Sequence, residues 1–77
     1  MQIDLLDTFL DLAETRSFHR TAERLRITQS TVSARVTALE QAVGSRLFDR
    51  SRAGTDLTPE GKRFEPHARA LRHEWNE

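Results

Sequence analysis

The chain has 77 residues with 12 basic and 12 acidic side chains, and a chain of this length can bury the core of one small domain only. The absence of cysteine excludes disulfides and thiolate metal sites and suits a reducing cytoplasm, which is the expected location. No apolar run approaches the roughly 20 residues of a membrane helix, and the acidic start lacks the basic segment of a signal peptide, so we expect neither membrane insertion nor export.

The net charge of zero conceals an uneven distribution along the chain. Residues 1–14 have a net charge of −4, residues 15–55 combine eight arginines with three acids for a net charge of +5, and residues 56–77 have a net charge of −1. A basic middle segment is the electrostatic pattern expected of a protein that binds nucleic acid. The alternative interpretation is that charges of both signs only solvate the surface.

Two helices are predicted in the first third of the chain. Apolar residues recur at helical spacing over Ile3–Thr15, and their broad stripe is expected to lie in the core. The acids of this helix are not expected to contact DNA.

Ser17 is a capping residue for the next helix, whose buried side consists of Phe18, Ala22 and Leu25. Arg20, Arg24 and Arg26 lie off that stripe, where they could contact phosphate. Alternatively, Arg20 or Arg24 forms an ion pair with Glu23 or with an acid of the first helix.

A third helix is predicted after a turn that Ile27 closes and Thr28 caps. Val32, Val36, Leu39 and Val43 define its buried face. The opposite face carries Ser30, Ser33, Ala34, Thr37 and Gln41, with Gln29 at its N-terminal edge and Arg35 on a flank. Short side chains let a helix approach base edges closely, whereas a merely solvated face is more usually filled with Glu and Lys. Residues 17–43 therefore have the pattern of a helix-turn-helix that places its second helix in the DNA major groove.

A small two-stranded wing is predicted after this helix. Gly44 fits the left-handed position that ends a helix. Residues 46–50 and 55–57 alternate weakly as strands, and residues 51–54 have turn chemistry. Arg50 and Arg52 near the tip are expected to reach a minor groove or the DNA backbone; alternatively they are solvated on a flexible loop.

The last predicted helix begins at Thr58 and Pro59, a capping residue followed by proline in the first turn. Pro66 is expected to bend this helix or to loosen one hydrogen bond. An apolar stripe runs along it through Phe64, Ala68, Leu71 and Trp75. We expect the same helix of a second copy to cover this stripe, and the alternative is packing onto the chain's own core.

Motifs at collinear spacing extend over nearly the whole chain. They are Thr15-Arg16-Ser17-Phe18, Ala22-Glu23-Arg24-Leu25, Ile27-Thr28-Gln29-Ser30, Val32-Ser33, Leu39-Glu40, Gly44, Leu47-Phe48-Asp49-Arg50 and Leu57-Thr58-Pro59-Glu60-Gly61. With these motifs the chain resembles the N-terminal part of a LysR-type transcriptional regulator, a bacterial or archaeal gene regulator.

The resemblance implies a mainly α fold, with a winged helix-turn-helix in residues 1–58 and a linker helix in residues 59–77. It also implies a homodimer through antiparallel linker helices that binds an interrupted inverted repeat in double-stranded DNA. Members of this family normally carry an effector-binding domain after the linker helix. That domain is expected to be absent from this sequence, so a small-molecule effector would act only through the missing part.

The resemblance also implies particular contacts. Gln29, Ser30 and Ser33 would meet bases or nearby phosphates, and Arg35 and Arg52 would meet the backbone or a minor groove. Family members often have arginine at the positions that Ala34 and Ala53 occupy here, so Thr37 or the Ala34 methyl is a candidate for contact with a thymine methyl. The expected DNA-binding residues are Gln29, Ser30, Thr31, Ser33, Ala34, Arg35, Thr37, Arg50 and Arg52, and the expected dimerisation residues are Phe64, Ala68, Leu71 and Trp75.

Two other functional classes are alternatives to DNA binding. In a protein-interaction domain, the third helix and Trp75 would dock a protein partner, and such an apolar interface would respond less to salt than DNA binding does. The sequence does not support a catalytic function. His19, His67 and His73 are scattered, no glycine-rich phosphate loop occurs, and no nucleophile is flanked by a base. We therefore expect no catalytic activity, no metal and no cofactor.

Overall fold

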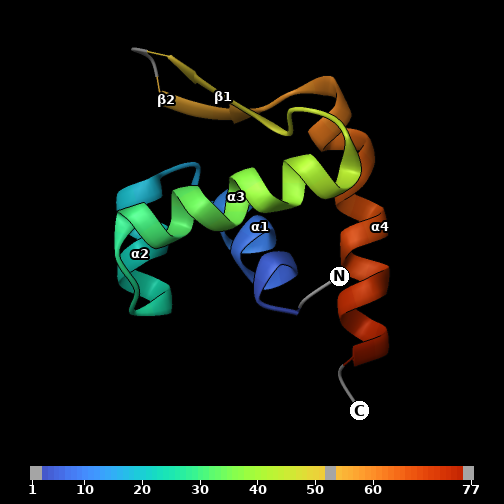
Figure 1. The fold of residues 1–77 in the computed structure, drawn as a ribbon, viewed down its shortest axis with the longest axis horizontal. Coiled ribbons are helices and arrows are strands. Elements are labelled where there is room, and N and C mark those ends of the chain that lie inside the picture. The colour runs from blue at the N-terminus through green and yellow to red at the C-terminus, as the bar shows by residue number, and fades with distance from the viewer. Residues whose placement is uncertain (1–2, 52–53, 76–77) are drawn as a thin grey trace.

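The computed structural model describes residues 3–51 and 54–75. The elements follow in the order α1 (Ile3–Thr15), α2 (Phe18–Leu25), α3 (Gln29–Val43), β1 (Phe48–Ser51), β2 (Gly54–Leu57) and α4 (Pro59–Trp75). In Figure 1, α3 crosses α1, the two strands extend along one side of α3 toward α2, and α4 runs across the other end of α3. The predicted mainly α fold, a winged helix followed by a further helix, is confirmed.

Capping residues determine where the helices of the helix-turn-helix begin and end. The Ser17 hydroxyl accepts a hydrogen bond from the Arg20 N–H at 3.0 Å, and the Thr28 hydroxyl accepts one from the Thr31 N–H at 3.0 Å. Gly44 ends α3 in the left-handed region with φ 85°, where a residue without Cβ has no steric penalty. These three predicted ends of helices are confirmed.

The core lies where α1 meets α3, the wing and α4. Phe9 of α1 is fully buried, and its ring centroid lies 5.4 Å from that of Phe48 and 5.2 Å from that of Phe64. Leu12, Leu39 and other apolar side chains complete one cluster that all four helices share. A single core of this kind holds α3 and the wing in a fixed relation, because both contribute buried side chains to it and neither can move without opening the cluster.

The wing is an antiparallel pair in which Phe48 lies opposite Leu57, and Arg50 lies opposite Thr55. Its base is tied to α4 through Thr58. The Thr58 N–H donates to the Leu47 carbonyl at 3.0 Å, and the Thr58 hydroxyl donates to the Arg46 carbonyl at 2.6 Å. The same hydroxyl caps α4 by accepting from the N–H of Gly61 at 2.9 Å.

The first half of α4 belongs to the core of its own chain, which corrects the predicted dimerisation stripe. Ala68 is fully buried within the single chain, and Phe64 packs edge-on against Phe9. The reason is that α1 offers an apolar surface to α4, as the alternative interpretation required. Leu71 is 37% exposed and Trp75 is 59% exposed, so only the distal part of the stripe is open to a partner. The helix continues through Pro66.

Candidate nucleic-acid interface

The outward face of α3 gathers most of the residues predicted to contact DNA. Gln29, Ser30, Ala34 and Thr37 are exposed, and Ser33 between them is partly buried. They share a face because Val32, Val36 and Leu39 occupy the buried side of the same helix. The exposed surface is low and polar, and such a surface fits closely against the edges of base pairs.

Glu40 is the only acidic residue of α3, and it lies at the edge of this face that adjoins the wing, in one hollow with Ser33 and Thr37. Its Oε2 accepts hydrogen bonds from the backbone N–H groups of Leu47 at 2.8 Å and Phe48 at 3.3 Å. The carboxylate therefore joins the C-terminal part of α3 to the start of the wing.

Thr31 and Arg35 are placed differently from the rest of the predicted set. The Thr31 hydroxyl lies 2.9 Å from the Thr28 hydroxyl, within the cap of α3. Arg35 turns toward α1, where Nη1 donates to the Thr8 hydroxyl at 3.4 Å and Nη2 lies 4.0 Å from Asp4 Oδ2. The structure does not bring these two side chains together with the outward residues of α3, because both lie on its flanks.

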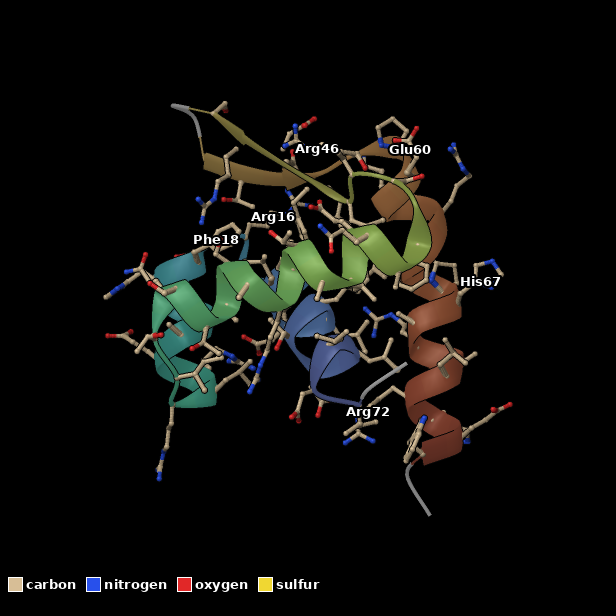
Figure 2. The ribbon with its side chains drawn as sticks, in the orientation of Figure 1. Arg16, Phe18, Arg46, Glu60, His67 and Arg72 are labelled. Atoms are coloured by element: carbon tan, nitrogen blue, oxygen red, sulfur yellow. The ribbon has the colours of Figure 1, made fainter. Side chains whose placement is uncertain are left out.

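A hollow of about 440 Å³ lies between the wing and the N-terminal ends of α2 and α3. In Figure 2 the labelled side chains of Arg16 and Phe18 lie in this region, between the strands and the helices. The residues that line the hollow are Arg16, Ser17, Phe18, His19, Gln29, Arg50, Ser51, Gly54 and Thr55. The hollow is open to solvent and adjoins the outward face of α3. A DNA backbone that followed α3 would therefore run next to the residues that line this hollow.

Arg50 is held in this hollow by an aromatic side chain of α2. Its guanidinium carbon lies 3.5 Å from the centroid of the Phe18 ring, which is cation–π geometry. The stacking restrains the wing relative to α2 and leaves the N–H groups at the edge of the guanidinium free to meet phosphate. Arg52, the other predicted wing residue, lies outside the described residues.

Two further residues of the hollow were not singled out as DNA-binding residues from sequence. Arg16 adopts the left-handed conformation with φ 55°, and its Nη1 lies 3.5 Å from Asp56 Oδ1 of β2. His19 Nδ1 lies 3.3 Å from Gln29 Nε2, and His19 Nε2 lies 3.3 Å from Glu23 Oε2. The feature of the sequence that could have indicated a role for both residues is their position next to the Ser17 cap, at the start of the helix-turn-helix.

Residues 3–62 match the model of the family described as "Bacterial regulatory helix-turn-helix protein, lysR family". This match covers well over half of the chain. The chain belongs to the LysR family. The predicted resemblance is thus confirmed, and the helix-turn-helix with its wing is the LysR-type DNA-binding domain. Transcriptional regulators are not a class of enzymes.

Relatives in this family extend well beyond the segment that matches. HTH-type transcriptional regulator HdfR of Yersinia pestis (strain Pestoides F) is 47% identical over 75 residues, which are 97% of this chain and 26% of the relative. HdfR of Yersinia pseudotuberculosis serotype O:1b (strain IP 31758) matches to the same extent. The chain therefore spans about a quarter of the length of the curated relatives it matches.

Solved structures of LysR-type proteins have the same fold. Vibrio fischeri DarR in complex with DNA superimposes with a TM-score of 0.92 at 38% identity, over 99% of this chain and 26% of that one. A complex of BenM DBD with catB site 1 DNA gives a TM-score of 0.89 at 30% identity, over 99% of this chain and 85% of that one. Both of those structures contain DNA.

The arginines of α2 and of its C-cap in this LysR-type domain divide into two groups. Arg24 is committed to α1, because its Nε donates to Asp11 Oδ1 at 2.7 Å and its Nη2 lies 3.8 Å from Glu14 Oε1. The hydrogen bond and the charge of Asp11 raise the pKa of Arg24 above its usual value. Arg20 and Arg26 are exposed and form no ion pair with any residue that the structure describes. These two remain available for phosphate.

Other kinds of site find no support in the part of the LysR-type domain that the structure describes. Within residues 3–51 and 54–75, no three His, Cys, Asp or Glu side chains are grouped so as to hold a metal ion. His67 projects from the side of α4 away from α3 (Figure 2). None of the helices in these ranges is long and apolar enough to cross a membrane.

Proposed function

We propose that this chain binds double-stranded DNA sequence-specifically, as a homodimer on an interrupted inverted repeat. The observation that carries the proposal is the outward face of α3, which is exposed, small and polar and whose one acid, Glu40, is hydrogen-bonded to the backbone at the base of the wing. The family match and the DNA-containing structures of similar domains support it. In this proposal α3 enters the major groove, and the wing lies against the adjacent backbone or minor groove.

In this proposal, contacts with phosphates supply affinity and contacts with bases supply specificity. Arg20, Arg26 and Arg50 would neutralise phosphates and supply the part of the affinity that depends on salt. Gln29, Ser33 and their neighbours on α3 would form hydrogen bonds and apolar contacts with base edges, and these contacts depend on sequence. Arg35 is left out of the first group, since its guanidinium is paired with α1.

The distal end of α4 is the surface we propose for the second copy. Leu71 and Trp75 are exposed there, and the ion pair between Arg72 and Asp7 holds this end of the helix against α1. Figure 2 shows Arg72 between α4 and α1. The 17 residues of α4 extend over about 25 Å. An antiparallel pair of such helices would separate two α3 helices by roughly one turn of DNA, about 34 Å.

Fluorescence anisotropy tests the proposal directly. The chain is titrated into labelled duplexes of random sequence and into duplexes enriched by repeated selection, at two salt concentrations. We expect an enriched inverted repeat to bind more tightly than random DNA, and both affinities to fall steeply with salt. Absence of binding at low salt and high protein concentration, with dimerisation verified by sedimentation, would favour the protein-interaction alternative.

Arg50→Ala is expected to weaken binding to enriched and to random DNA alike, by about threefold to tenfold, because it removes a phosphate contact that does not read sequence. The slope of log affinity against log salt should become shallower by about one. Arg63→Ala is the matched control, since Arg63 is an exposed arginine on α4 paired with Glu60. A selective loss on the enriched duplex would instead place Arg50 among the residues that read bases.

Ser33→Ala is expected to weaken binding to the enriched duplex by about fivefold or more and to leave binding to random DNA within about twofold, because Ser33 lies in the middle of the outward face of α3. The measurement is the ratio of the two affinities. Ser45→Ala removes the same hydroxyl just beyond the end of α3 and serves as the control. Equal losses on both duplexes would remove Ser33 from base recognition.

A further inference from the structure

The side chains of His19 and Gln29 connect α2 to the first residue of α3. His19 Nδ1 lies 3.3 Å from the Gln29 amide nitrogen, and the other ring nitrogen lies 3.3 Å from Glu23 Oε2. Both side chains are exposed and border the hollow beneath the wing. Gln29 is therefore not a free surface amide, because an imidazole and a carboxylate form a chain of polar contacts that ends on it.

The carboxylate determines which hydrogen-bonding role each ring nitrogen has. A neutral imidazole has one N–H donor and one acceptor nitrogen, and an ionised carboxylate can only accept. The ring proton therefore lies on Nε2, where it faces Glu23, and Nδ1 is the acceptor. Gln29 must then donate one of its two amide N–H groups to His19. Its carbonyl oxygen and its second N–H remain available to another molecule.

We propose that His19 is a positioning residue that fixes the orientation of the Gln29 amide and so selects the base pair that this end of α3 accepts. The inference rests on the proposed DNA-binding function. One acceptor and one donor match the N6 amino group and N7 of adenine in the major groove, whereas two donors match O6 and N7 of guanine. While Nδ1 of His19 holds one amide N–H, Gln29 presents the adenine pattern.

The charged groups around the ring are Glu23 on α2, with Arg16 of the α1–α2 turn and Arg50 of β1 lining the same hollow. Of these three, only Glu23 can accept a hydrogen bond from the ring, and this contact keeps Nδ1 as the acceptor for Gln29.

The experiment uses a set of duplexes that carry each base pair in turn at every position of the half-site obtained by selection. The position that Gln29 reads is the one at which Gln29→Ala loses discrimination. At pH 8, we expect the unmodified chain to prefer A·T there by roughly tenfold. His19→Ala should reduce that preference to below about threefold and leave discrimination at the other positions unchanged.

Two controls separate positioning from loss of structure. His67→Ala removes an exposed histidine on α4, and it should retain the A·T preference of the unmodified chain. Thermal unfolding of His19→Ala should match that of the unmodified chain, since His19 is exposed. Glu23→Gln, which no longer determines the proton position on the ring, should weaken the A·T preference without abolishing binding.

Three results would overturn the inference. They are an unchanged preference in His19→Ala, a uniform loss at every position of the half-site, and the absence of any position that responds to Gln29→Ala. Failure of the proposed function itself has a different signature. In that case the unmodified chain would bind no duplex more tightly than random DNA, which the first titration shows before any variant is compared.

Discussion

Gly61→Ala is expected to lower the free energy of unfolding by about 3 kcal/mol, at the upper end of what overpacking costs. A Cβ at this position would lie 2.2 Å from the Leu47 carbonyl oxygen and 2.9 Å from Leu57 Cδ2. The oxygen belongs to the backbone at the base of the wing, so it cannot rotate away as a side chain does. The first turn of α4 would have to move away from the wing, which would strain the hydrogen bond from Thr58 to Leu47.

Thermal unfolding measures this loss, and for a domain of this size the midpoint should fall by about 12–24 °C. Gly44→Ala is the matched control, because its Cβ would have no atom within 4 Å and its φ of 85° alone opposes the substitution. That conformational penalty is only about 1 kcal/mol. A variant at Gly61 that is as stable as the one at Gly44 would mean that α4 can shift freely on the wing.

The boundaries of the elements followed from the sequence because they depend on neighbours a few residues away. Ser17, Thr28 and Thr58 each cap the helix that follows, and Gly44 ends α3 through a conformation that few other residues tolerate. The helical spacing of apolar residues likewise identified the buried side of α3. Such local rules need no knowledge of the tertiary structure.

The contacts that shape the candidate interface depend on pairs distant in sequence, and these were not predictable in detail. Nothing near Arg50 indicates that it stacks on Phe18, and nothing near Arg35 indicates that it turns to Thr8. The same limitation affected α4, whose apolar stripe was identified correctly but was assigned to a second copy along its whole length. Phe64 packs against the core of its own chain, and only the three-dimensional arrangement shows that α1 has an apolar surface to offer it.

The interface depends on the angle between α3 and the wing, and Glu40 is the side chain that connects the two. Its Oε2 is the acceptor for the N–H groups of Leu47 and Phe48, residues that are 0% and 3% exposed. Hydrogen bonds to a charged group are stronger than those between neutral groups, and a buried donor left without an acceptor carries the full penalty of desolvation. One carboxylate therefore fixes the backbone at the start of the wing to the C-terminal part of α3.

Glu40→Ala is expected to lower the free energy of unfolding by about 2–4 kcal/mol, because it leaves two buried N–H groups without an acceptor. Amide hydrogen exchange tests the cause directly, since the N–H groups of Leu47 and Phe48 should exchange faster than the other protected amides of the core. Glu40→Gln is the control, because its amide oxygen still accepts and the loss should be about 1 kcal/mol.

The same variant distinguishes two ways in which α3 and the wing can act on DNA. If they bind as one rigid surface, folded Glu40→Ala will lose affinity for enriched and random duplexes together, because the wing no longer holds Arg50 at a set distance from α3. If α3 alone carries recognition, affinity will change little at temperatures where the variant remains folded. We expect the first result, since the stacking of Arg50 on Phe18 and the hydrogen bonds of Glu40 restrain the wing from both sides.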